Sequence, residues 1–223
     1  PGASATIAMR GRKAAGISVS LEHPYADRLM NLRVMVRLEE LRAAIDDFQE
    51  ADIERLAGRF PAASLGIAYA LLRGKDLQLA GVAVDALRDA LPENPDTHVL
   101  HGEWASRQGR HAEAVGAFVH AESLGLPAFS AGLTYLSDRL RLYARLRGAS
   151  VASRGRAERE HKIDASQIDQ ADGALERLQP FLLACDFEGP TANYSGLHPT
   201  RPSGKKLTSA QFESISERAI LHE

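Results

Sequence analysis

The chain has 223 residues, of which 44% are hydrophobic and 25% charged, a composition that favours a packed globular core in one large or two small domains. Its 27 basic and 29 acidic side chains give a net charge of −2, so we expect neither a nucleic-acid nor a membrane partner. The one cysteine, Cys185, excludes an internal disulfide and agrees with a reducing, cytoplasmic compartment.

The sequence pattern of residues 1–23 predicts a small β-hairpin. Apolar residues alternate with small or polar ones on both sides of the sequence RGRK, at Ile7, Met9, Ile17, Val19 and Leu21. A two-stranded hairpin is marginally stable by itself and needs a surface to pack on. One interpretation is that residues 1–23 are the end of a domain that precedes this chain.

The sequence pattern of residues 24–148 predicts a series of helices. Apolar residues recur at helical spacing, and Gly or Pro separates one run from the next. Long helices are expected at 24–46 and 128–147. Shorter helices are expected between them, at 62–74, 75–91, 97–109 and 110–125.

Residues 149–223 are less regular. A polar linker at 148–165 precedes a helix at 166–185, which Pro180 is expected to kink or break. The Gly- and Pro-rich stretch 186–206 predicts a long irregular loop. A capping-box pattern after it predicts an amphipathic C-terminal helix.

The stretch from Gly102 to Pro127 contains small residues and an aromatic residue at spacings suited to two crossing helices. Gly102 and Ala114 are small where the helices approach, and Phe118 is large enough to fill the space beside them. Gly109 can adopt the positive φ that ends a helix. Together with Ala121 and Pro127, this pattern resembles a tetratricopeptide repeat, a helix–turn–helix unit of about 34 residues. The preceding stretch, which begins at residue 61, is a looser match.

The resemblance implies a right-handed superhelix that binds protein partners on a concave face lined by the first helix of each unit. The partner-binding residues it implies are Asp96, Val99, Glu103, Ser106 and Arg107, with Ala63, Ile67 and Ala70 from the preceding unit. Packing against the second helix is assigned to Leu100, Gly102, Trp104 and Ala105. Because Glu103 and Arg107 are four residues apart, the alternative is that they only pair with each other along the helix. The carboxylate-binding type of repeat is not expected, since its Lys and Asn positions hold Val99 and Glu103.

Catalytic and metal-binding interpretations are weaker. His98, His101, His111 and His120 lie close together in the sequence, but neither HExxH nor CxxC accompanies them, so interhelix and surface roles are favoured over zinc. Cys185 with His198 as a base would make a nucleophile, but a buried inert thiol is favoured. No cofactor, metal ligand or catalytic residue is therefore predicted.

The sequence as a whole predicts an all-α, tetratricopeptide-like repeat protein with a small N-terminal β-hairpin. The expected function is a protein–protein interaction module, a scaffold or adaptor for a protein partner or a subunit of a larger complex. The alternative is a helical regulatory or accessory part of a larger enzyme or effector complex, whose catalytic site lies on another domain or subunit.

Overall fold

The computed structural model describes residues 4–10, 13–20, 26–29, 38–45, 50–74, 76–148, 155, 162–186 and 191–194. The chain divides into two compact units. Unit 1 comprises residues 1–93 with 188–191, and unit 2 comprises residues 94–187 with 192–223. The division falls inside the predicted helical region 24–148.

The N-terminal part of unit 1 contains two strands. Strand β1 (Ser4–Arg10) pairs antiparallel with β2 (Lys13–Ser20), and Ile7 is opposite Ile17. The register shifts between Ala8 and Met9, which is the position of a bulge or irregularity.

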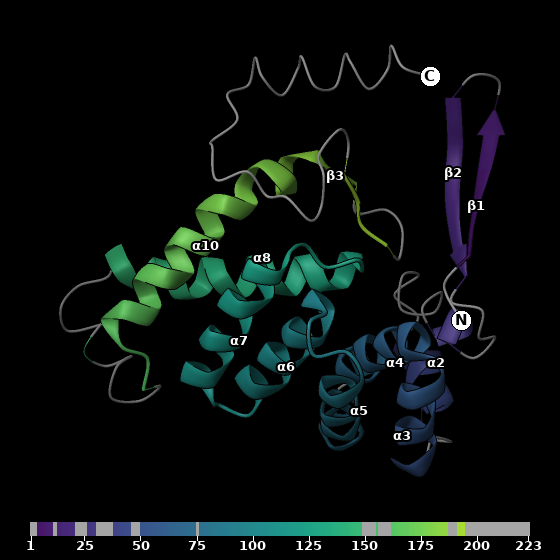
Figure 1. The fold of residues 1–223 in the computed structure, drawn as a ribbon, viewed down its shortest axis with the longest axis horizontal. Coiled ribbons are helices and arrows are strands. Elements are labelled where there is room, and N and C mark those ends of the chain that lie inside the picture. Colours follow the sequence, from purple (N-terminus) through teal and green to yellow (C-terminus); the bar gives the residue numbers. More distant parts are fainter. Residues whose placement is uncertain are drawn as a thin grey trace. The chain divides into compact units, whose positions relative to one another are not determined.

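The helices of unit 1 pack around α4. They are α2 (Leu38–Ile45), α3 (Glu50–Arg59), α4 (Pro61–Gly74) and α5 (Leu77–Ala90) (Figure 1). Helix α4 contacts each of the other three, and its residues from Ala63 to Leu72 are all buried. A proline at its first position fits there, because the first helical N–H has no partner within the helix. Asp76 caps α5 by accepting a hydrogen bond from the Leu79 N–H at 3.0 Å.

Most of the helices predicted for unit 1 are confirmed. Helices α4 and α5 match the expected ranges 62–74 and 75–91. Of the long helix expected at 24–46, residues 26–29 and 38–45 are helical and the remainder lies outside the described residues.

Unit 2 begins with a helical hairpin of α6 (Pro95–Arg107) and α7 (His111–Leu124). Asn94 caps α6 by accepting a hydrogen bond from the Asp96 N–H at 2.9 Å. Gly109 has a φ of +77°, as the sequence predicted for the residue that ends the first helix. The predicted close crossing is also confirmed, because a Cβ added at Gly102 would lie 2.9 Å from the ring of the fully buried Phe118.

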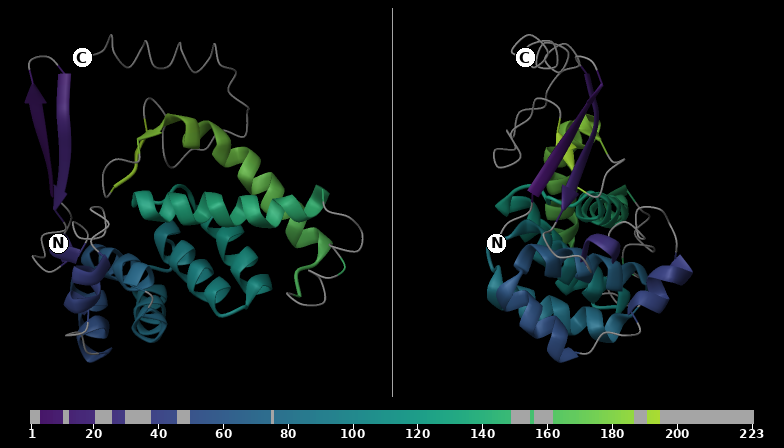
Figure 2. Two further views of the ribbon diagram at one scale, coloured as in Figure 1. Left: turned by 180° about the vertical axis from the view of Figure 1, so that it is seen from behind. Right: turned by 90° about the vertical axis from the view of Figure 1, so that its right-hand side faces the viewer.

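Three further segments complete the helical part of unit 2. Helix α8 (Ser130–Ala144) continues into the short 3₁₀ helix η1 (Arg145–Gly148), and α10 (Ala165–Ala184) follows later in the chain. Helix α8 packs on both α6 and α7, and α10 packs on α7 and α8 (Figure 2). Asp164 and Gln167 form a capping box at the start of α10.

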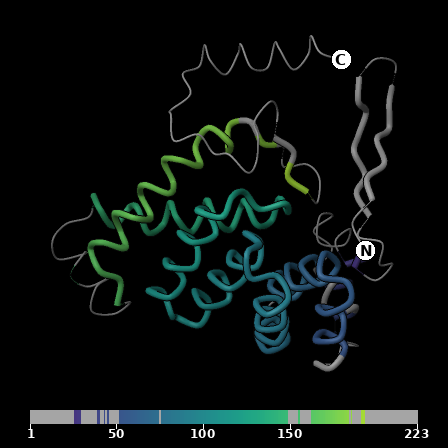
Figure 3. The backbone as a smooth tube through the Cα atoms, viewed as in Figure 1, coloured from purple at the N-terminus to yellow at the C-terminus, as the bar shows by residue number. Residues whose placement is uncertain are grey.

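Helix α10 does not end at Pro180, which corrects the expected break. It is a single element that continues to Ala184 (green in Figure 3). A proline lacks the N–H that would bond to the carbonyl four residues earlier, which destabilises a helix. Leu178 and Phe181 on either side of Pro180 are both buried, and this tertiary packing offsets the loss.

After α10, the stretch 186–206 is not wholly irregular. The two-residue strands β3 (Cys185–Asp186) and β4 (Asn193–Tyr194) pair antiparallel. The backbone N–H of Ala192 donates to the carbonyl of Ala128 at 2.8 Å, which holds this segment against the start of α8. The predicted C-terminal amphipathic helix lies outside the described residues.

The fold class is all-α, since helices form the core of each unit. Within the described ranges, no helix combines the length and the apolar character that a membrane crossing requires.

Candidate functional site

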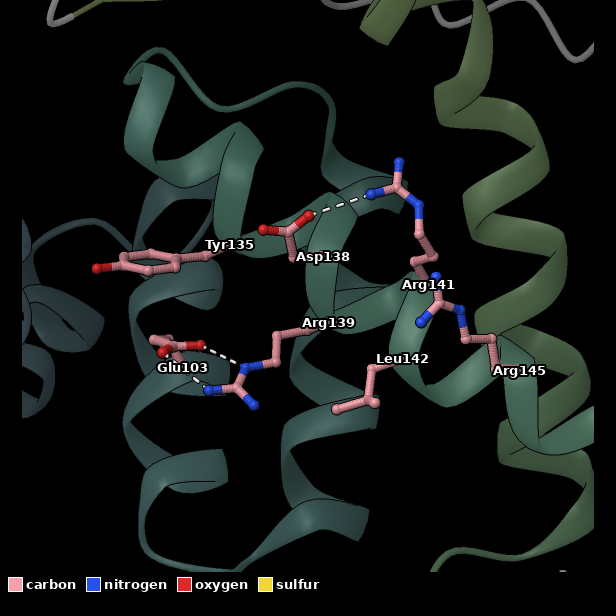
Figure 4. A pocket seen from close by; sticks show the side chains of 7 residues that line it. All are labelled: Glu103, Tyr135, Asp138, Arg139, Arg141, Leu142 and Arg145. Atoms are coloured by element: carbon pink, nitrogen blue, oxygen red, sulfur yellow. Dashed lines mark hydrogen bonds and ion pairs between the residues drawn. The ribbon is translucent and has the colours of Figure 1, made fainter.

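An open groove on α8 is the best candidate for a functional site. It has a volume of about 450 Å³ and lies entirely within unit 2. We call it the α8 groove and define it by its lining residues: Glu103, Tyr135, Asp138, Arg139, Arg141, Leu142 and Arg145. Glu103 comes from α6, Arg145 begins η1, and the other lining residues belong to α8 (Figure 4).

Glu103 is a buried carboxylate at one side of the α8 groove. Its side chain is 2% exposed and pairs with two arginines. Arg139 donates from Nε to Oε2 at 2.7 Å and from Nη2 to Oε1 at 3.0 Å, the bidentate geometry that suits guanidinium and carboxylate (Figure 4). Arg107 donates from Nε to Oε1 at 2.7 Å. Hydrogen bonding to Glu103 raises the pKa of Arg139 and outweighs the opposing effect of burial. Glu103 therefore joins α6 to α8 and holds Arg139 in a fixed orientation.

Aromatic side chains surround this ion-pair cluster. The Arg107 guanidinium lies 5.7 Å from the centre of the Tyr135 ring, within the range of a cation–π contact. Deeper in unit 2, the Tyr143 hydroxyl donates to Ser106 Oγ at 3.2 Å and lies 3.0 Å from His111 Nδ1. These contacts fix the side chains behind the α8 groove.

The partner-binding face predicted for α6 assumed that its residues are exposed, and this assumption is wrong. Asp96, Val99, Glu103 and Ser106 are all buried, and the Arg107 side chain is 23% exposed. Each of the four buried residues takes part in packing or in bonds to later segments. The Asp96 carboxylate, for example, accepts hydrogen bonds from the backbone N–H groups of Ala128 at 2.7 Å and Phe129 at 3.3 Å. Glu103 and Arg107 do pair along the helix, but the predicted alternative that they pair only with each other is wrong, because Glu103 also pairs with Arg139 of α8.

The residues assigned to the concave face from the preceding repeat are buried too. Ala63, Ile67 and Ala70 are between 0% and 1% exposed. They belong to the core of unit 1 because α4 is packed by other helices along its length. They do not present an exposed surface.

The sequence did contain a signal for the α8 groove, although the prediction did not use it. Tyr135, Asp138, Arg139 and Leu142 follow one another at spacings of three, one and three residues, and these positions share one face of a helix. The apolar periodicity predicts a helix at 128–147 but assigns no binding surface to it. Leu142, the apolar member of this set, is 48% exposed.

The histidines make contacts between helices. His98 and His120 form an edge-to-face ring pair with centroids 4.4 Å apart, and His101 Nε2 lies 2.8 Å from Glu113 Oε1. Within the described residues, His, Cys, Asp and Glu side chains do not gather in any group of three or more that could hold a metal ion. Cys185 is half-buried, and His198 lies outside the described residues.

Glu113 of α7 forms a second ion-pair cluster, with Arg110 and His101. Its Oε2 accepts a hydrogen bond from Arg110 at 2.7 Å, and the Arg110 guanidinium lies 4.5 Å from the centre of the Trp104 ring. Burial acts to raise the pKa of Glu113, but the hydrogen bond with His101 and the charge of Arg110 hold it below its ordinary value of 4.5.

The Glu113→Gln variant should lose less than about 1 kcal/mol of unfolding free energy at neutral pH, since the Glu113 ion pair is exposed. Because the carboxylate has a lower pKa in the folded than in the unfolded state, its contribution is present above the unfolded value. It is lost as the pH falls through the folded value. Denaturation followed by Trp104 fluorescence should distinguish the two proteins at pH 7 and much less at about pH 3. An equal difference at both pH values would contradict this role for Glu113.

Comparison with known proteins identifies the family. No curated protein and no solved structure matches the chain. The family described as the Y4kD C-terminal domain matches residues 29–221, which include α2 to α10 and the whole α8 groove. The match extends over far more than half of the 223 residues. The chain therefore belongs to the Y4kD C-terminal domain family.

Proposed function

We propose that this protein is a protein–protein interaction module of the tetratricopeptide-like kind and that it binds a partner in the α8 groove. The observation that carries the proposal is the groove itself, an open depression of about 450 Å³ with the exposed Leu142 among its lining residues. Arginine and tyrosine are enriched among the residues that dominate binding at protein interfaces, and the exposed leucine beside them adds apolar surface that a partner can bury.

The helical hairpin beside the groove supports the tetratricopeptide-like interpretation. The close contact of Gly102 with Phe118 and the positive φ of Gly109 are the features expected of a unit in which two helices cross closely. Ala114 and Ala121 are fully buried, as small residues at such a crossing should be. The proposal differs from the sequence-based expectation in its binding surface, which is placed on α8 instead of α6. The single cysteine supports a cytoplasmic location for this function.

A second candidate function is a helical accessory part of a larger enzyme or effector. It is supported by the description of the matching family, which names the C-terminal domain of Y4kD and therefore a part of that protein. In this case the partner in the α8 groove would be another domain or subunit of the same complex.

A comparison of two exposed leucines tests the proposed function. Leu142 lines the α8 groove, whereas Leu183 is 81% exposed on α10 and does not line it. Wild type, Leu142→Ser and Leu183→Ser should be used as baits in extracts of the source organism, after circular dichroism has shown that all three fold. We expect a protein that wild type and Leu183→Ser retain and that Leu142→Ser binds at least about fivefold more weakly, the effect of a hot-spot truncation. Equal retention of every protein by all three baits would contradict the proposal.

A further inference from the structure

The charges in the α8 groove indicate what kind of segment it accepts. Resting on the function proposed above, we infer that the partner segment is an acidic peptide with an adjacent apolar residue. Its carboxylates would face Arg141 and Arg145, and its apolar side chain would cover Leu142. Figure 4 shows Leu142 between Arg139 and Arg145, so one short segment can reach both kinds of side chain.

The arginines of the groove differ in how far their charges are already compensated. Arg139 is bound to Glu103, which Arg107 shares. Arg141 donates to Asp138 at 3.1 Å, but these side chains are 47% and 61% exposed, so this pair is easily exchanged for another carboxylate. The Arg145 side chain is exposed and forms no ion pair or hydrogen bond with any described residue. Arg145 is thus the cation with the most to gain from a bound carboxylate.

A purely structural role explains Arg145 less well. Cations near the C-terminus of a helix interact favourably with its last carbonyls, and Arg145 follows the last residue of α8. Arg147, two residues later, is the arginine that ties η1 to α10, through ion pairs with Asp169 and Asp172. Arg145 instead lines the groove beside an exposed leucine.

The same groove favours a peptide over a nucleic acid. Two carboxylates, Glu103 and Asp138, stand among its three arginines, so the surplus of positive charge is small. Binding to a phosphate backbone requires several uncompensated cations, and the groove has few of them. A carboxylate beside an apolar residue matches both features of the groove.

The test begins with peptides selected on the full chain from a displayed library of random linear sequences. We expect the selected peptides to be enriched in Asp and Glu next to an apolar residue. Fluorescence anisotropy of one labelled peptide should show binding at least about tenfold weaker for Arg145→Glu than for wild type, and weaker binding at higher salt. Arg88→Glu on α5, 49% exposed and outside the groove, changes the net charge equally and should leave the affinity unchanged. Arg141→Gln provides a second variant with a smaller change in charge, and circular dichroism checks the folding of each.

Several outcomes would overturn the inference. Selection of neutral or basic peptides that Leu142→Ser loses and Arg145→Glu keeps would refute the acidic partner while leaving the proposed function intact. Failure to select any peptide would count against the proposed function as well. Binding of a labelled single- or double-stranded DNA that Arg145→Glu abolishes would replace the peptide with a nucleic acid.

Discussion

The Phe118→Ala variant is expected to unfold with a free energy about 3–5 kcal/mol lower than that of wild type. The Phe118 side chain is fully buried, and its ring fills the space beside Gly102 where α6 and α7 cross. Alanine would leave a cavity that the two helices cannot close without moving apart. Chemical denaturation followed by the fluorescence of Trp104, the only tryptophan in the chain, reports on this hairpin directly.

A substitution of Gly102, the other residue of the contact with Phe118, serves as the control for Phe118→Ala. A Cβ at Gly102 would lie 2.9 Å from the Phe118 ring, so Gly102→Ala should cost about 1–3 kcal/mol through overpacking. In a Phe118→Leu background the smaller side chain leaves room, and Gly102→Ala should cost less. Additive effects of the two substitutions would show that the residues do not touch.

The second large effect is expected for Glu103→Ala, with a loss of about 3 kcal/mol in the free energy of unfolding. The substitution removes a carboxylate that is 2% exposed and leaves Arg107 and Arg139 without their shared partner. The value is at the lower end for a broken buried ion pair, because both arginine side chains are about a quarter exposed and water can solvate part of their charge. Trp104 fluorescence during denaturation again provides the measurement.

Glu113→Ala is the matched control for Glu103→Ala. Both glutamates belong to the α6–α7 hairpin and both pair with arginine, but the Glu113 side chain is 39% exposed. Its removal should cost less than about 1 kcal/mol. If Glu103→Ala cost no more than Glu113→Ala, the carboxylate of Glu103 would not be the brace between α6 and α8.

Local signals in the sequence were sufficient to predict the helices and the turn of the α6–α7 hairpin. Gly109 ends the first helix, and the small residue at 102 opposite Phe118 sets how closely the helices approach. The observed start at Pro95, capped by Asn94, lies only two residues before the expected start at residue 97. Each of these is decided by the backbone preferences or the size of the residue itself. They therefore hold whatever packs around the hairpin.

The sequence by itself determined that this protein is helical, where most of its described helices lie and which residues bring α6 and α7 together. The tertiary structure decided which surface is left for a partner. Helix α6 has polar residues that the sequence pattern predicts to be exposed. In the structure, ion pairs and hydrogen bonds from residues 32 to 37 positions later, on α8 and the segment before it, bury Asp96, Glu103 and Ser106. The same kind of packing carries α10 past Pro180. The pattern of polar and apolar residues along a helix does not show whether a polar side chain is buried. A polar side chain can be buried when a residue distant in the sequence bonds to it, and only the folded chain brings the two together.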